Sequence, residues 1–188
     1  MLARPDFQDT LELVNEKPAP PALQNARDEF VTQWGAMGTA WGINRTMAQI
    51  HALLLTSPRS LSTDEIMAEL RISRGNANTN LRDLVGWGLI RSVIRKGERK
   101  EYFEAEKEVW RIFCTIARER KRREVSPAMD VLRRCADETK DLAHPEAAHF
   151  HHQMRELLEF MQMGERMLDR IARADQSRIL RLAARFLK

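Results

Sequence analysis

The 188-residue sequence contains two cysteines and one tyrosine, and it has no apolar run long enough to cross a bilayer. Both cysteines, Cys114 and Cys135, fall in amphipathic helical stretches, which indicates buried thiols in a reducing compartment. No basic and then apolar leader opens the chain. We therefore expect a soluble, cytoplasmic protein that needs no disulfide.

Signatures of catalysis are also missing from the sequence. It has no glycine-rich phosphate loop, no nucleophile elbow and no cysteine or histidine spacing of zinc-ligand quality. Its carboxylates alternate with arginine and lysine on the expected helix surfaces, as they do on solvated faces. We expect a protein that is not an enzyme and that carries no cofactor and no metal.

Basic residues are in modest excess overall, with a net charge of +4 and a sequence pI near 9.4. The excess is concentrated between residues 71 and 100, where the acidic residues are Asp83 and Glu98. A local concentration of this kind favours a polyanionic partner such as nucleic acid. The basic residues of the stretch are Arg71, Arg74, Arg82, Arg91, Arg95, Lys96, Arg99 and Lys100.

Two short helices separated by a tight turn are predicted within this part of the chain. Ser62 and Glu65 form a capping box that opens the first helix, which ends near Arg71. Ser73 caps a second helix that continues through Trp87. The inner stripe of the second helix is expected to be Ala77, Leu81, Leu84 and Val85. Its outer face is expected to carry Arg74, Asn76, Asn78, Thr79, Asn80 and Arg82.

Residues 89–94 and 101–103 are predicted to form two strands, joined by the basic, glycine-centred loop 95–100. Together with the two helices this hairpin indicates a winged helix–turn–helix, with residues 73–87 as the recognition helix. Asparagine, arginine and serine side chains pair with base edges or phosphates in a major groove. The residues expected to contact double-stranded DNA are Ser73, Arg74, Gly75, Asn76, Asn78, Thr79, Asn80, Arg82, Arg95, Lys96, Arg99 and Lys100.

Several strings in the first half of the chain resemble the GbsR-like branch of the MarR superfamily. They are Met37–Thr46, Ile50–Leu55, Leu61–Ile66, Ile72–Arg82, Trp87–Ile90 and Gly97–Phe103. The resemblance is specific from about residue 30 to residue 103, and beyond residue 105 it rests on helical character alone. It implies a dimeric bacterial transcription regulator, often a repressor that a small effector releases from its promoter.

The expected fold is mainly α with a small β-hairpin, in three parts. Residues 1–22, rich in proline near their end, form a flexible arm. Residues 23–105 are expected to form the winged helix–turn–helix, and residues 106–188 are expected to form long helices for dimerisation that are also a candidate effector-binding region. Ser126 followed by Pro127 is expected to start a new helix, and residues 179–187 to form a last amphipathic segment. Apolar stripes on these helices favour burial against a second copy across a two-fold axis.

Two groups of side chains offer alternatives. Trp34, Met37 and Trp41 flank a glycine-rich bend and, with Trp110, are either core anchors or the lining of an effector pocket suited to a cation. His144, His149, His151 and His152 form a polar helix start or, in a metal-responsive regulator, a zinc site. A winged-helix adaptor that binds protein without DNA specificity is a further alternative.

Overall fold

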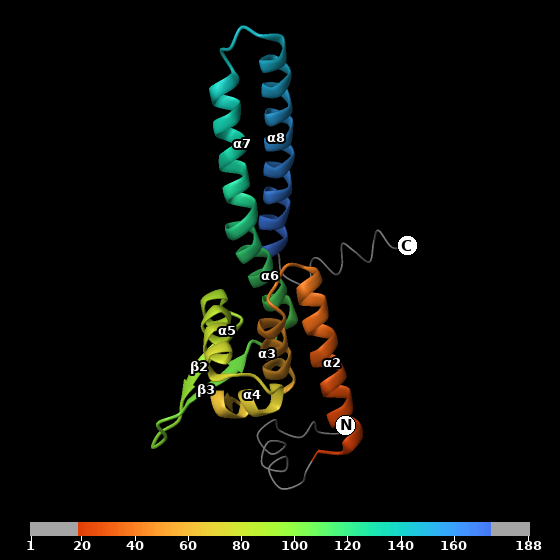
Figure 1. The fold of residues 1–188 in the computed structure, drawn as a ribbon, viewed down its shortest axis with the longest axis vertical. Coiled ribbons are helices and arrows are strands. Elements are labelled where there is room, and N and C mark those ends of the chain that lie inside the picture. Colours follow the sequence, from red (N-terminus) through yellow and green to blue (C-terminus); the bar gives the residue numbers. More distant parts are fainter. Residues whose placement is uncertain (1–18, 174–188) are drawn as a thin grey trace, which may run out of the picture. The chain divides into compact units, whose positions relative to one another are not determined.

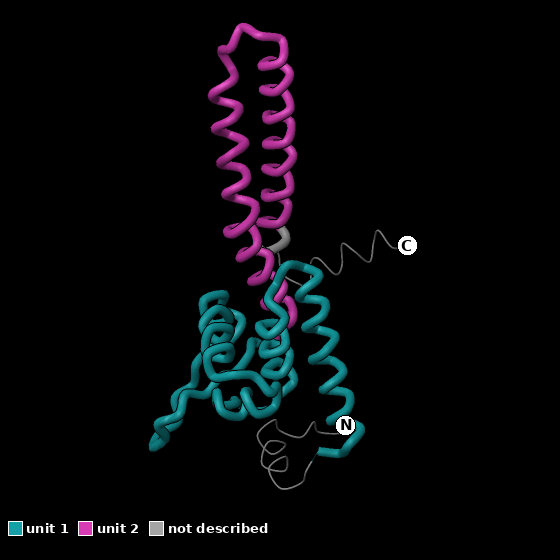
Figure 2. Tube along the Cα trace, in the orientation of Figure 1, with its two compact units in different colours: residues 1–107 teal, residues 108–188 magenta. Residues whose placement is uncertain are grey.

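The structure, a computed structural model, describes residues 19–173 (Figure 1). Internal contacts divide the chain after Lys107 into two compact units (Figure 2). Most of the predicted arm at 1–22 and all of the predicted segment at 179–187 lie outside the described residues. No helix in the described range is both long and apolar enough to cross a membrane.

The first unit is a winged helix–turn–helix, as the sequence predicts. Its sheet is antiparallel with the strand order β1-β3-β2, so the short strand β1, which the sequence did not reveal, extends the predicted hairpin to three strands. The elements are α2 (Pro21–Ala40), α3 (Arg45–Thr56), β1 (Leu61–Ser62), α4 (Thr63–Leu70), α5 (Arg74–Trp87), β2 (Ile90–Ile94) and β3 (Glu101–Ala105).

The predicted helix caps of this unit are confirmed. The Glu65 amide donates to Ser62 Oγ at 3.3 Å, and the Ser62 amide donates to Glu65 Oε2 at 2.7 Å, which completes the capping box of α4. Ser73 accepts from the Asn76 amide at the start of α5. Arg71, in the left-handed conformation, ends α4, and Gly88 ends α5 in the same way.

The glycines near residue 40 allow two helices to approach closely. A Cβ atom on Gly38 would lie 2.6 Å from the Cβ of Ala48, and one on Gly35 would lie 2.6 Å from Cγ of Gln49. α2 runs unbroken to Ala40 and packs against α3, and the chain reverses between the two helices in residues 41–44, where Gly42 takes φ +75°. This contact, together with the fully buried Ile50, Leu54, Ile66, Leu81 and Leu84, fixes the platform that carries α5 and the wing.

The second unit is a helical hairpin. Its elements are α6 (Val109–Arg120), a π-helical turn (Lys121–Val125), α7 (Ser126–Thr139) and α8 (Pro145–Arg173). α7 begins at Ser126 as expected, but Ser126 is not a cap: the backbone is right-handed helical on both sides of this start, and the Ser126 amide donates to the Lys121 carbonyl five residues earlier. A proline inside a helix crowds the preceding turn, and the wider π turn directly before Pro127 accommodates it without a break.

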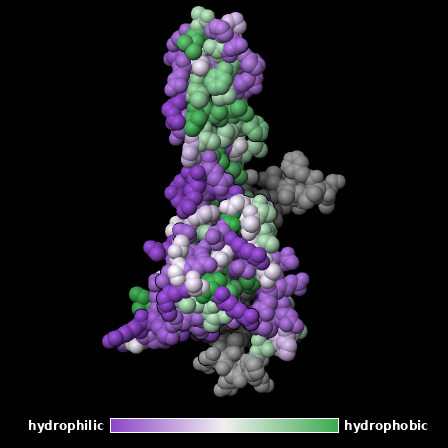
Figure 3. Space-filling view, viewed as in Figure 1, coloured by the Kyte–Doolittle hydropathy of each residue, from purple (hydrophilic) through white to green (hydrophobic). Residues whose placement is uncertain are grey.

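α8 has two apolar stripes. One stripe packs on α7: Leu158 of α8 is buried, and so are Met129 and Ala136 of α7. The other stripe remains exposed within this unit, and hydrophobic residues are visible on the surface of the hairpin (Figure 3). Its members, spaced by three or seven residues, are Phe150, Leu157, Phe160 and Met167. On α6, Val109 and Phe113, which periodicity assigns to the buried side, are also exposed in the described chain.

Candidate nucleic-acid interface

The outer face of α5 presents a row of polar side chains to solvent. Ala77, Leu81 and Leu84 turn inward and hold the helix on the domain, since each is at most 1% exposed. The exposed positions that the sequence assigns to DNA contact are Ser73, Arg74, Gly75, Asn76, Asn78, Thr79 and Arg82. Amide and guanidinium groups on one helix face can donate to and accept from base edges in a major groove.

Asn80 does not belong to that face, which corrects the sequence-based assignment. Its side chain is only 4% exposed, and its Nδ2 donates to the Asn76 carbonyl at 2.8 Å and to Asn76 Oδ1 at 2.6 Å. Asn80 lies between Ala77 and Leu84 on the inner side of the helix, where hydrogen bonds to the previous turn make burial of an amide tolerable. Val85, expected inside, is instead 42% exposed.

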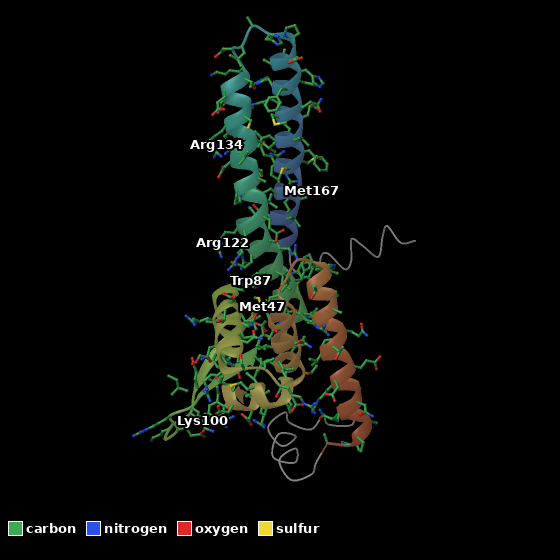
Figure 4. All side chains as sticks on the ribbon, viewed as in Figure 1. Met47, Trp87, Lys100, Arg122, Arg134 and Met167 are labelled. Carbon is green, nitrogen blue, oxygen red and sulfur yellow. The ribbon has the colours of Figure 1, made fainter. Side chains whose placement is uncertain are left out.

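The wing is a tight basic turn between β2 and β3. Gly97 takes φ +86°, a conformation that side chains disfavour, and so allows the chain to reverse. Lys96, Arg99 and Lys100 are exposed around this turn, and Lys100 can be located in Figure 4. Three cations on one short loop are suited to a phosphate backbone or a minor groove.

Arg95 has a second role as a brace of the wing. Its guanidinium lies 3.9 Å from the centroid of the Tyr102 ring, and its Nη2 donates to Ser60 Oγ at 2.9 Å. The Tyr102 hydroxyl in turn donates to the Glu98 carboxylate in the loop. These contacts tie the base of the wing to β3 and to the turn before β1, so the loop cations start from a fixed position. Contact of Arg95 with DNA remains a prediction.

Asp64 links the recognition helix to the wing, a feature that sequence reasoning missed. Arg74 Nη2 donates to Asp64 Oδ1 at 2.6 Å, and Lys100 Nζ lies 3.4 Å from Asp64 Oδ2. Hydrogen bonds from Arg74, which has the larger effect, and from Lys100 lower the pKa of Asp64 below its usual value. The carboxylate is therefore ionised at neutral pH and partly neutralises two candidate DNA contacts.

A buried histidine lies in the core behind this surface. His51 is 3% exposed, its ring centroid is 6.2 Å from that of Trp34, and its Nε2 has no hydrogen-bond partner among the described residues. Burial, with a smaller contribution from the positive charge of Lys107, lowers the pKa of His51 to about 4. The Lys107 ammonium donates to the carbonyls of Leu54, Leu55 and Ser57 and so caps the end of α3.

The aromatic residues considered for an effector site divide between the two units. Trp34 is half-buried and packs against Phe30 with a centroid separation of 5.3 Å. Met37 and Trp41 are 36% and 59% exposed. Trp110 belongs to the second unit, where it stacks on Phe113. The effector site formed by these residues therefore stays a prediction.

The histidine cluster near the tip of the hairpin is dispersed. His151 Nδ1 is 2.8 Å from the Ala136 carbonyl on α7, whereas His149 and His152 are exposed on other sides of α8. His144 Nδ1 accepts from the Glu146 amide at the start of α8. Over residues 19–173, no three histidine, cysteine, aspartate or glutamate side chains are grouped so that they could hold a metal ion.

Comparison with known proteins points to transcription regulators. The chain is 24% identical over 112 residues to the HTH-type transcriptional repressor GbsR of Bacillus subtilis, which is 60% of this chain and 62% of that protein. It therefore spans less than two thirds of the length of GbsR. This chain is also 30% identical over 138 residues to the HTH-type transcriptional regulator MmpR5 of Mycobacterium tuberculosis. The match covers 71% of this chain and 79% of MmpR5.

A solved structure described as the crystal structure of a transcriptional regulator has the same fold. The TM-score is 0.57 at 23% identity, and the match covers 79% of this chain and 99% of that one. No protein-family model matches the chain. The extent of the similarity to MmpR5, together with GbsR and the shared winged fold, decides the family. The chain belongs to the MarR-like helix–turn–helix transcriptional regulators.

Proposed function

We propose that this DNA-binding regulator recognises a specific double-stranded sequence as a homodimer and represses transcription until a small effector binds. The observation that supports this most directly is the exposed row of asparagine and arginine on α5 beside the basic wing. The row supplies donors and acceptors for base edges, and the wing supplies charge for the flanking backbone. A repressor of this kind acts in the cytoplasm, at the promoter it blocks.

A second copy is needed to cover the exposed stripe of α8. Phe150, Leu157, Phe160 and Met167 lie on one side of the helix, away from the side that packs on α7. Apolar residues at this spacing bury one another when two helices associate. A two-fold dimer would then present two copies of α5 to successive major grooves, whose separation is about 34–36 Å.

Repression and its release are the part of the proposal that rests on relatives. GbsR is named a repressor. An effector that binds near Trp34, Met37 and Trp41 would alter the spacing of the two recognition helices and hence their affinity for DNA. A coupling free energy of about 1–3 kcal/mol is enough for a response of about 5- to 150-fold.

The test is selection of bound fragments from genomic DNA by the purified protein, followed by substitution of one base-reading candidate. Asn78→Ala is expected to weaken binding to the selected sequence by about 1–3 kcal/mol, with a smaller loss on random duplex. Gln33→Ala, which removes an exposed amide from α2 in the same unit, is the control. An equal loss on both DNAs would assign Asn78 to the backbone.

The wing is tested through the salt dependence of binding. Lys96→Ala combined with Arg99→Ala is expected to reduce the slope of log affinity against log salt by up to about 1.8, since each phosphate contact contributes about 0.9. The control removes two exposed cations of the second unit, Arg134→Ala with Lys140→Ala. An unchanged slope in the wing variant would exclude the wing from the interface, and absence of salt-dependent duplex binding by the unmodified protein would favour the adaptor alternative.

A further inference from the structure

Asp64 lies where two candidate DNA contacts from different elements converge. It is the second residue of α4, Arg74 is the first residue of α5, and Lys100 follows the wing turn. One carboxylate oxygen accepts from the Arg74 guanidinium at 2.6 Å, and the other is 3.4 Å from the Lys100 ammonium. All three side chains are substantially exposed, so the cluster lies on the surface that the interface would use.

The geometry of this cluster is that of an occupied anion site. A guanidinium and an ammonium that converge on two oxygens of one carboxylate can also converge on two oxygens of a phosphodiester. At the position that Asp64 occupies the two anions compete, because the Arg74 and Lys100 groups that face it already contact the carboxylate and part of their positive charge is neutralised there. DNA phosphate at this position therefore requires that Asp64 give up at least one of its partners.

We propose that Asp64 is an internal competitor of the DNA phosphate, which holds Arg74 and Lys100 in the free protein and lowers the affinity for duplex DNA. The inference rests on the proposed function, since it assigns a regulatory role to a residue of the same surface. Its effect is independent of sequence, because phosphates are common to every duplex. Asp64 thereby reduces the occupancy of random DNA, which competes with the specific site in a genome.

The consequence for salt dependence follows from the same competition. With Asp64 present, part of the positive charge of Arg74 and Lys100 is already neutralised before DNA binds, so fewer counterions are exchanged on binding. Without the carboxylate, both cations act fully on the phosphate backbone. The slope of log affinity against log salt is expected to become steeper by about 0.9, the contribution of one phosphate.

The experiment measures binding of the full chain to a random 30-base-pair duplex over a salt series. Asp64→Asn keeps the size of the side chain and removes its charge, and is expected to tighten binding by about 2- to 10-fold near physiological salt, since exposed ion pairs are individually weak. Glu69→Gln is the matched control, because it removes the same charge from the same helix at a residue that accepts from Gln24. Thermal unfolding of both variants checks that the unit stays folded.

A second background separates competition from general repulsion of DNA. In a protein with Arg74→Ala and Lys100→Ala, the increase in DNA affinity caused by Asp64→Asn should shrink to that caused by Glu69→Gln, because the two cations that Asp64 holds are absent. Weaker binding by Asp64→Asn, or tightening no greater than that of Glu69→Gln in the unmodified protein, would overturn the inference. If the unmodified protein fails to bind duplex DNA at all, the proposed function fails instead.

Discussion

Replacing Leu157 and Phe160 with glutamate is expected to convert the proposed dimer into a monomer and to weaken binding to the selected DNA sequence by about 100-fold or more. Leu157 is 47% and Phe160 68% exposed on the stripe of α8 that turns away from α7. Two carboxylates in each protomer would be forced into an apolar interface, at a cost that association does not repay. A monomer keeps one recognition helix and loses the gain from binding two half-sites together. Sedimentation or light scattering gives the mass, and titration of the selected duplex gives the affinity.

The control for this prediction is His152→Glu. His152 is exposed on α8, on the side turned away from both Leu157 and the packed residue Leu158, and the substitution adds a negative charge to the same helix. It should leave the mass and the operator affinity unchanged. A dimer that persists in the double glutamate variant would show that the exposed stripe is not the interface.

Local chemistry explains why much of the fold is predictable. The capping box of Ser62 and Glu65, the cap of Ser73 and the turn at Gly97 each depend on residues within four positions of one another. The number and order of helices in the winged unit follow from such signals together with apolar periodicity. They place the base-reading candidates on one helix before any tertiary contact is known.

The sequence-based predictions are wrong where the polarity of a residue and its position on the helix disagree. Polarity places Asn80 on the outer face, but its position between Ala77 and Leu84 turns it inward, where Asn76 accepts hydrogen bonds from its amide. At Ser126, a cap followed by proline is a strong start signal, yet the π-helical turn before it carries the helix onward. A single-position rule does not detect a change of helix type in the preceding turn.

The contacts that fix the interface are long-range, so the sequence does not reveal them. Arg95 and Ser60 are 35 positions apart, and Asp64 is ten positions from Arg74. In sequence each of these cations counts equally as a wing or helix charge. The structure distinguishes Arg95, which braces the wing, from Arg74 and Lys100, which share one carboxylate, and from Lys96 and Arg99, which lie exposed at the turn.

Acidification from pH 7 to pH 4 is expected to destabilise the winged unit by about 3 kcal/mol through His51 alone. Its folded-state pKa is about 4 against an ordinary value of 6.5, because the ring is buried and lies near the positive charge of Lys107. Between these two values the unfolded chain takes up a proton that the folded chain excludes. Stability is therefore fully present above pH 6.5 and is lost as the pH falls toward 4. Denaturant titration followed by tryptophan fluorescence measures it, since Trp34, Trp41 and Trp87 all lie in this unit.

The His51→Leu variant isolates this contribution from that of other groups. Asp64 and Glu65 also have lowered pKa values and will destabilise the fold at the acid end of the range, but they do so equally in both proteins. The difference in unfolding free energy between His51→Leu and the unmodified protein should therefore grow in favour of the variant as the pH falls from 6.5 to 4. His149→Leu, at an exposed position of α8, should show no such trend. A constant difference across this range would mean that His51 accepts a proton inside the folded core, and that the space beside Nε2 admits a partner for it.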